Sequence, residues 1–357
     1  MSKPTKTLLV SLLVLLPILF LGCNKSSSST SKSSSDRKLY IYNWSYYTPD
    51  SVIASFEKEY NCEVVLDYFA SNEEMYAKIK ASGTGGGYDI IFPSGDYVSI
   101  MAKQNMLEKI DLAKFPNKKY LTPLVLEKAT YDPDMEYSVP YYMGAAGVAV
   151  NKKNVATYER TWNIFGDKRL AGRMCMMDDM REVLGDALKY LGYSVNTSNG
   201  KELEEARVLV KNQWKPNLVK FDAEGFAKSF ASGEYYVTQG YAEGIFEELP
   251  EEKWGDVDFF IPEAGGPMYI DSMCIPKGAK HYDLAMDFIN YIQDPKNYAL
   301  FLDRFHFPSS VNTDAEQFRT TKPFYTIDDL KNCELKDDLG QDLDKYNTAW
   351  ESIRYVE

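Results

Sequence analysis

The chain has 357 residues, of which 45% are apolar and 26% charged, as in a folded globular protein of about two domains. Its formal net charge of -12 argues against a nucleic-acid partner, which would need clustered lysine and arginine, and is compatible with a cationic ligand. Aromatic residues make up 14% of the chain, with 27 tyrosines and 18 phenylalanines, so rings are available beyond an ordinary core.

The N-terminus has the pattern of an export signal. Lys3 and Lys6 precede an apolar run over residues 8–21. This run is short for a membrane span and is typical of a cleaved signal peptide, which we expect to comprise residues 1–22.

A Gly-Cys pair ends the apolar run and resembles the lipidation site of bacterial lipoproteins, with Cys23 as the lipidated residue. Serine then dominates residues 26–35. Because such a segment cannot bury a core, we expect residues 23–37 to be a flexible lipidated tether. The mature chain would then be anchored to a membrane at its periplasmic or other extracytoplasmic face.

Ordered structure is expected from Lys38 onward. The first expected elements are strands at 39–42, 63–66 and 88–92, and helices that begin at Thr48 and at Ser71. Thr48 and Pro49 are the expected N-cap and first residue of one helix, and Ser71 with Glu74 caps the next. The alternation of strands and helices predicts a parallel sheet whose loops gather at its carboxyl edge.

A glycine-rich segment, Gly83 to Gly87, precedes an expected strand. A phosphate-binding loop should follow a strand and end in Lys-Ser or Lys-Thr. We therefore interpret this segment as the end of a helix and a connector.

Two long β-like stretches, at 137–150 and 268–275, are candidate crossings between two lobes. Between and after them we expect strands at 174–177, 235–240 and 257–261, and helices from Asp179, over 226–233, over 284–292, from Asp294 and over 339–354. The sequence thus predicts a second α/β unit, and no internal repeat is apparent.

Asp179 and Glu182 lie three residues apart where a strand is expected to end and a helix to begin. One hypothesis is that both carboxylates bind an amino group of a polycationic ligand. The alternative is a helix cap, with Asp179 as N-cap and Glu182 at N3. The two interpretations are compatible, because an N-cap aspartate keeps a second oxygen available.

Several loops after expected strands carry rings and acids together. They contain Trp44, Tyr46 and Tyr47; Asp96 and Tyr97; Asp179 and Glu182; Tyr241 and Glu243; and Tyr269 and Asp271. Rings pack on the methylenes of a linear polyamine and attract its ammonium groups, while carboxylates fix its nitrogens. Each ring alone is more often part of a core, and Glu243 has the alternative of a solvated charge beside Glu247 and Glu248.

Catalytic and metal-binding motifs are missing from the sequence. The two histidines, His281 and His306, belong to no HExxH motif, and no Gly-x-Ser-x-Gly is present. Four cysteines follow Cys23, and none of them forms a CxxC motif, so a zinc site is not expected. Two of the four, Cys175 and Cys274, lie in apolar runs and are expected to be buried thiols, and the other two are Cys62 and Cys333. We expect no catalytic residue, metal or cofactor, although paired acids leave a glycoside hydrolase open.

Six segments, in their order along the chain, resemble the spermidine/putrescine-binding proteins of bacterial ABC polyamine importers. They are Tyr42-Asn43-Trp44-Ser45 with Tyr47, Ser71-Asn72-Glu73 with Met75-Tyr76-Ala77-Lys78, Tyr88-Asp89 with Pro93-Ser94, Asp178-Asp179 with Arg181-Glu182-Val183, Leu191-Gly192-Tyr193-Ser194, and Asp271-Ser272 with Ile275-Pro276.

The resemblance implies an α/β, two-lobed type II periplasmic-binding-protein fold with the ligand cleft between lobes. Lobe 1 would comprise 38–143 and 271–315, and lobe 2 would comprise 144–270 and 316–357. The implied function is a monomeric extracytoplasmic receptor for spermidine, putrescine or both that delivers its ligand to an ABC permease. Alternatives are a solute-binding lipoprotein for another cationic ligand and a signalling or adhesion lipoprotein with the same fold.

The resemblance also implies site residues. Asp179, Glu182 and Asp271 match the acids that hold the polyamine nitrogens. Trp44 and Tyr47 match aromatic walls, with Ser45 in the same motif, and Ser94 matches a polar contact.

Other positions depart from the family pattern. Tyr241 and Tyr269 stand where relatives often have tryptophan, Phe307 replaces a tyrosine, Asp96 replaces a ring of spermidine-preferring members, and Lys336 falls near a glutamine. These departures leave the choice between spermidine and putrescine open.

Overall fold

The computed structural model of the chain describes residues 37–45, 47–83 and 85–355. The predicted signal peptide, the predicted lipidation site Cys23 and all but the last residue of the predicted tether lie outside the described residues. Within the described part, no helix is both long enough and apolar enough to cross a membrane.

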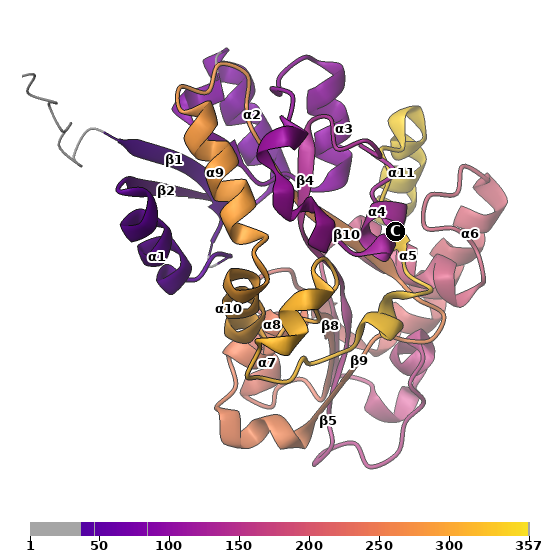
Figure 1. The fold of residues 1–357 in the computed structure, drawn as a ribbon. Helices are drawn as coiled ribbons and strands as arrows, with labels where there is room; N and C mark the ends of the chain where they lie inside the picture. Colours follow the sequence, from indigo (N-terminus) through magenta and orange to yellow (C-terminus); the bar gives the residue numbers. More distant parts are fainter. Residues whose placement is uncertain (1–36, 46, 84, 356–357) are drawn as a thin grey trace, which may run out of the picture. The chain divides into compact units, whose positions relative to one another are not determined.

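Strands and helices alternate along most of the chain (Figure 1). The strands are β1 (Lys38–Trp44), β2 (Glu63–Phe69), β3 (Ile90–Ile91), β4 (Ser138–Ala145), β5 (Gly147–Asn151), β6 (Met174–Met176), β7 (Leu218–Phe221), β8 (Val237–Gly240), β9 (Val257–Phe260), β10 (Pro267–Cys274) and β11 (Glu334–Leu335). The helices are α1 (Asp50–Tyr60), α2 (Asn72–Ser82), α3 (Gly95–Lys103), α4 (Pro123–Lys128), α5 (Met180–Tyr190), α6 (Gly200–Leu209), α7 (Phe226–Ala231), α8 (Ala242–Glu247), α9 (Tyr282–Ile292), α10 (Pro295–Phe305) and α11 (Leu343–Arg354).

The first sheet has the strand order β11-β10-β3-β1-β2, and β4 also pairs with β10. β1 runs parallel to β2 and β3, while β10 is antiparallel to β3 and β4. Leu39 and Ile41 of β1 are fully buried, and they share a core with Leu284 and Phe288 of α9. The period of apolar residues along α9 places its buried side chains on one face, as expected for a helix that covers a sheet.

The second sheet has the order β7-β6-β8-β5-β9. Strand β5, which lies between β8 and β9, has apolar residues on both faces. Val148 and Val150 join a core with residues of α5, α6 and α11, whereas Ala149 belongs to the other core cluster. The alternation along β5 is the period-two pattern of a strand that is covered on both sides.

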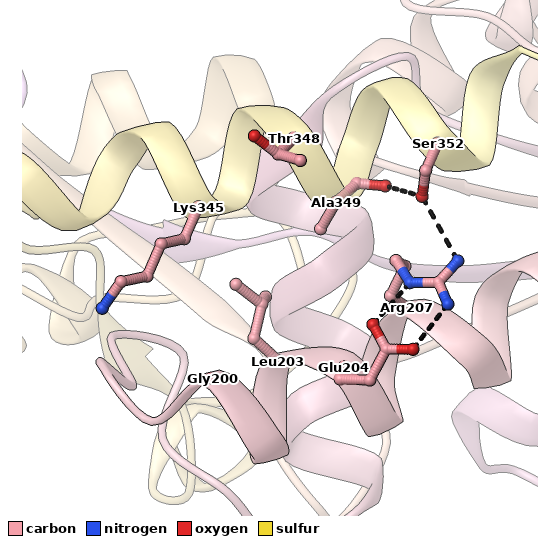
Figure 2. A pocket seen from close by; sticks show the side chains of 8 residues that line it. All are labelled: Gly200, Leu203, Glu204, Arg207, Lys345, Thr348, Ala349 and Ser352. Atoms are coloured by element: carbon pink, nitrogen blue, oxygen red, sulfur yellow. Dashed lines mark hydrogen bonds and ion pairs between the residues drawn. The ribbon is translucent and has the colours of Figure 1, made fainter.

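A surface pocket lies between α6 and α11 (Figure 2). Its charged lining is already paired, because Arg207 forms an ion pair with Glu204 at 2.6 Å and donates to Ser352 Oγ at 3.3 Å. None of the ligand-binding residues expected from the sequence lines this pocket.

The chain passes from the first sheet to the second within the stretch at 137–150, where the sequence predicts one crossing. β4 ends at Ala145 in the first sheet, and β5 begins at Gly147 in the second. The return passage lies between β9 and β10, so most of the predicted stretch at 268–275 is strand of the first sheet.

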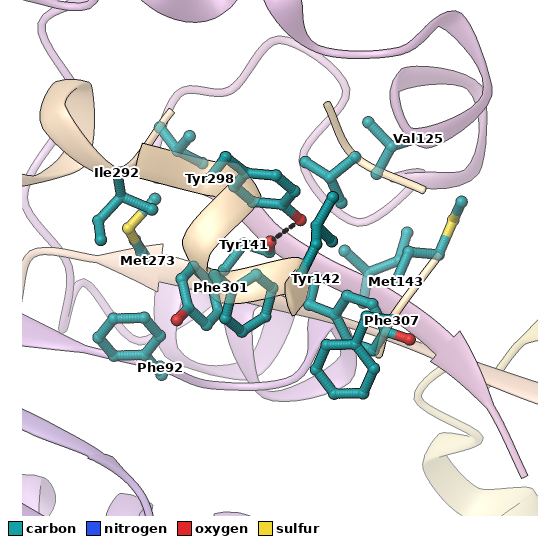
Figure 3. Packing of buried hydrophobic residues seen from close by; sticks show 14 of the residues in the cluster. Phe92, Val125, Tyr141, Tyr142, Met143, Met273, Ile292, Tyr298, Phe301 and Phe307 are labelled. Carbon is teal, nitrogen blue, oxygen red and sulfur yellow. Dashed lines mark hydrogen bonds between the residues drawn. The ribbon is translucent and has the colours of Figure 1, made fainter. Parts of the chain in front are cut away.

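An aromatic core fixes α10 against β4 (Figure 3). Tyr298 Oη donates to the carbonyl of Tyr141 at 2.7 Å, and the rings of Tyr141 and Phe301 are 4.7 Å apart. Phe307 stacks on Tyr142 with a centroid distance of 3.8 Å. These contacts give Tyr142 a fixed position on β4.

Most predicted helix starts are confirmed. Ser71 accepts from Glu74 N, and Asp294 accepts from Lys296 N. The predicted start at Thr48 is wrong: α1 begins at Asp50 after Pro49, and the hydroxyl of Thr48 instead bonds with Asn43 and Tyr141. A tertiary contact therefore replaces the local cap.

The cysteines of the described residues are free thiols: Cys62, Cys175, Cys274 and Cys333. Cys175 and Cys274 are fully buried, as the apolar runs around them predict.

Candidate ligand-binding site

Asp271 of β10 is one centre of the site and is only 5% exposed. Ser94 Oγ donates to Asp271 Oδ1 at 2.6 Å, and Tyr47 Oη donates to Oδ2 at 2.9 Å. Asn72 Nδ2 in turn donates to Ser94 Oγ at 3.0 Å, which fixes the serine hydroxyl toward the acid. Two of the predicted site residues, Ser94 and Tyr47, thus bond to the carboxylate of a third.

The N-terminus of α5 is the second centre. Asp179 Oδ1 accepts from the backbone N–H of Arg181 at 2.8 Å and of Glu182 at 3.0 Å. The predicted N-cap is therefore confirmed. Both bonds use the same oxygen, so Oδ2 remains available for a ligand.

Glu182 does not complete a capping box, because its side chain turns to tertiary partners. It is fully buried, and its Oε1 accepts from Lys336 Nζ at 2.6 Å and from Tyr241 Oη at 3.3 Å. Within the described part of the chain, Oε2 has no hydrogen-bond partner. A buried carboxylate oxygen without a donor is costly, so this atom is a ready acceptor for a cationic ligand.

The charge of Lys336 is maintained by its surroundings. Burial lowers the pKa of Lys336, but the carboxylates of Glu182 and Asp179 outweigh burial and raise it above its ordinary value. Burial likewise raises the pKa of Glu182, and Lys336 opposes that rise. The pair is therefore an ion pair inside the molecule.

A row of tyrosines connects the two centres. The ring of Tyr241 lies 5.6 Å from that of Tyr269, which lies 6.0 Å from that of Tyr142. Tyr142 is 6.4 Å from Tyr47, the ring that donates to Asp271. We call Tyr241, Tyr269, Tyr142 and Tyr47 the tyrosine row.

A glycine of β4 makes room for this row. A Cβ added at Gly144 would lie 2.9 Å from the hydroxyl oxygens of both Tyr269 and Tyr325. These contacts are shorter than real side chains adopt, so the close approach of the rings requires glycine at this position.

Glu243 and Asp96 are two further acids of the site, and they interact with Asp271 and Lys336 respectively. Burial raises the pKa of Glu243, in the first turn of α8, to about 7, and the charge of Asp271 adds to this. Burial also raises the pKa of Asp271 to about 6, although bonds from Ser94 and Tyr47 limit the rise. Asp96 of α3 has its pKa raised by burial, with Lys336 opposing. Glu243 is partly buried, not a freely solvated charge.

The remaining predicted residues have other surroundings. Trp44 donates from its indole N–H to the carbonyl of Phe92 at 2.9 Å and packs on Phe69. Ser45 is exposed in a turn, and no contact between described residues joins it to the acids. Phe307 is buried behind Tyr142 and supports the tyrosine row from the core.

Neither Tyr142 nor Gly144 is among the site residues that the sequence predicts, because both lie in a long β-like stretch that predicts a crossing between lobes. The juxtaposition of tyrosines and glycine in this stretch is the one local signal that could have indicated them.

The model of the bacterial extracellular solute-binding proteins matches residues 51–329. The chain belongs to this family. Among curated relatives, the spermidine/putrescine-binding periplasmic protein 1 of Haemophilus influenzae is 31% identical, over 93% of this chain and 94% of the relative. The putrescine/cadaverine-binding protein of Pseudomonas aeruginosa is 30% identical, over 76% of this chain and 78% of the relative.

A solved structure supports the assignment at the level of the fold. The chain superimposes on the TpPotD lipoprotein of Treponema pallidum with a TM-score of 0.86 and 54% identity, over 89% of this chain and 99% of that one. The predicted α/β, two-lobed periplasmic-binding fold is thereby confirmed.

Proposed function

We propose that the chain is an extracytoplasmic receptor that binds spermidine or putrescine and delivers it to an ABC permease. The observation that carries the proposal is the pair of buried carboxylates, Glu182 and Asp271, at the two ends of the tyrosine row. The names of the relatives from Haemophilus and Pseudomonas support the same ligand class.

Polyamine chemistry fits this arrangement. Ammonium groups of the ligand would donate charge-assisted hydrogen bonds to the carboxylates of Asp179, Glu182 and Asp271. The methylenes between the nitrogens would lie along the tyrosine row, where each cation–π contact contributes about 0.5–2 kcal/mol. The unpartnered oxygen of Glu182 would gain a donor.

The two lobes give the ligand two surfaces to bridge. We propose that lobe 1 comprises 38–143 and 271–315, and lobe 2 comprises 144–270 and 316–357. Asp271 belongs to the first sheet, whereas Glu182 follows a strand of the second, so one linear cation would join both. Trp44, Ser45, Asp96, Glu243 and Phe307 complete the proposed set of ligand-binding or supporting residues.

We also propose that the chain is a monomer that catalyses no reaction, binds no nucleic acid and is lipid-anchored through Cys23 after signal removal. Cys23→Ala is expected to move the protein from the membrane to the soluble fraction on cell fractionation. A variant that stays with the membrane would contradict the anchor.

A thermal-shift panel tests the ligand class. A ligand that binds only the folded state raises the melting temperature. Spermidine and putrescine should raise it, whereas sugars, amino acids and sulfate should not. Asp271→Asn should abolish most of the shift, and Asp283→Asn, on the exposed surface of α9, should preserve it. Equal shifts of the melting temperature in both variants would show that Asp271 does not contribute to ligand binding.

The rival carboxylate hydrolase makes a different prediction. It requires turnover of a glycoside that is lost in Asp179→Asn. A receptor shows no turnover and loses polyamine affinity in the same variant. Glycoside release by the wild type would overturn the receptor proposal.

A further inference from the structure

One ammonium group of the site belongs to the chain itself. Lys336 follows β11, and its Nζ lies 2.6 Å from Glu182 Oε1. The lysine side chain is 22% exposed and that of Glu182 is 0% exposed, so the contact is largely removed from water. We call Lys336 the resident ammonium.

The backbone holds the resident ammonium at one end of the tyrosine row. Lys336 N donates to the carbonyl of Met268 at 3.2 Å, directly beside Tyr269. The oxygen that accepts from Lys336 Nζ also accepts from Tyr241 Oη, the end of the row. A ligand that ran along the row toward α5 would therefore bring its terminal nitrogen close to this lysine.

Few free negative charges remain at this end. Asp96, Asp179 and Glu182 supply three carboxylates, and all three act on Lys336. Lys336 and Arg181 supply two positive charges. The charges of the same three acids favour the protonated form of Arg181 and so act to raise its pKa.

Asp186 is a fourth acid beside Glu182, but it is fully buried, and burial raises its pKa well above its ordinary value, which favours its neutral form. With Asp186 neutral, three carboxylates and two positive groups leave one negative charge, which matches one ligand ammonium.

We propose that Lys336 makes this receptor selective for a diamine over a triamine, by occupying the position at Glu182 that a further ligand ammonium would take. The inference rests on the proposed function and concerns the specificity of the same site. A diamine places one ammonium near Asp271 and Glu243 and one near Asp179 and the unpartnered Oε2 of Glu182. A triamine adds a third ammonium that meets the resident ammonium, and like charges at partly buried sites repel strongly.

Calorimetric titration of the wild type tests the inference without any substitution. Putrescine should bind at least about tenfold more tightly than spermidine. N-butylputrescine, which is spermidine with the ammonium of its propyl arm replaced by a methyl group, separates charge from length. It should also bind more tightly than spermidine. Spermidine binding as tightly as either diamine would overturn the inference.

Lys336→Gln provides the second test. Removing the resident ammonium should shift the ratio of putrescine to spermidine affinity toward spermidine by about tenfold or more. Lys331→Gln, an exposed lysine five residues upstream, should leave the ratio unchanged. An unchanged ratio in Lys336→Gln would overturn the inference while the proposed function stands. A wild type that binds no polyamine would overturn the proposed function itself.

Discussion

At the residue level, Asp179 has a capping role and a proposed ligand-binding role, which its two carboxylate oxygens divide. Oδ1 caps α5 through two backbone N–H groups, and Oδ2 is available to a ligand. The side chain of Glu182, one turn further, takes no part in the cap and pairs with Lys336 instead. The helix start and the proposed binding site can therefore share Asp179 without competition.

Asp179→Asn should separate these roles. Asparagine caps a helix about as well as aspartate, so the free energy of unfolding should change by less than about 0.5 kcal/mol. Loss of the charge should weaken polyamine binding by about 1.5–3 kcal/mol, the usual contribution of a charged hydrogen bond.

Chemical denaturation and calorimetry measure the two quantities. Asp294→Asn, which alters the N-cap of α10 and no proposed ligand contact, is the matched control and should leave both unchanged. If stability and affinity fell together in Asp179→Asn, the residue would be a cap alone.

The raised pKa values of Glu243 and Asp271 predict pH-dependent binding. A cationic ligand favours ionised carboxylates, so binding should release protons when these acids are partly protonated in the free protein. With a pKa of about 7 for Glu243 and about 6 for Asp271, affinity should fall roughly tenfold between about pH 8 and about pH 6. Glu243→Gln should remove most of this dependence, and a flat profile in the wild type would contradict it.

Stability without ligand should follow the opposite trend. Because both folded pKa values lie above the unfolded ones, the folded state takes up protons first as the pH falls. The contribution of these two acids to stability should therefore increase from about pH 8 to about pH 5.

At the scale of elements, the contact between α5 and β10 positions the two centres relative to each other. Gly185 of α5 packs directly on Pro267 of β10, and a Cβ on this glycine would lie 2.3 Å from Pro267 Cγ. The helix that carries Glu182 therefore approaches the strand that carries Asp271 because one residue has no side chain.

Gly185→Ala should disrupt this contact. Overpacking destabilises the folded state by about 1–3 kcal/mol. This cost exceeds the roughly 0.5–1 kcal/mol by which alanine stabilises a helix relative to glycine. The melting temperature should fall, and polyamine affinity should fall with it because α5 shifts from β10. Gly200→Ala, at the start of α6, is the control, since an added Cβ there meets nothing within 4 Å. Equal behaviour of the two variants would contradict the role of this contact.

At the scale of the whole molecule, two sheets with separate strand orders each supply part of the site. Their stability does not depend on disulfides, because the thiols of the described residues are free and three of them are buried. The cores around the two sheets therefore hold the site together.

Thiol titration of the Cys23→Ala protein tests whether the four remaining cysteines are free thiols. In the folded state only the partly exposed Cys62 should react rapidly with an aromatic disulfide reagent. Burial raises the pKa of Cys175 and of Cys333 to about 12, which further slows their reaction. All four thiols should react after denaturation without reductant, and fewer would indicate a disulfide.

Local signals predicted much of this fold. The caps at Ser71, Asp179 and Asp294 follow from residue types at fixed spacing, and the structure confirms them. The pairing of Lys336 with Glu182 joins residues 154 positions apart. The same holds for Asp271, whose bond with Tyr47 spans 224 positions. Such contacts depend on how the sheets pack, and residue spacing alone does not reveal them.

Calorimetric titration of the wild-type chain with putrescine decides whether this site binds a polyamine. Buried acids at both ends of the tyrosine row predict a one-to-one complex with a dissociation constant in the micromolar range or below. Heats indistinguishable from dilution, on protein that melts cooperatively, would contradict the claim that this site binds polyamines.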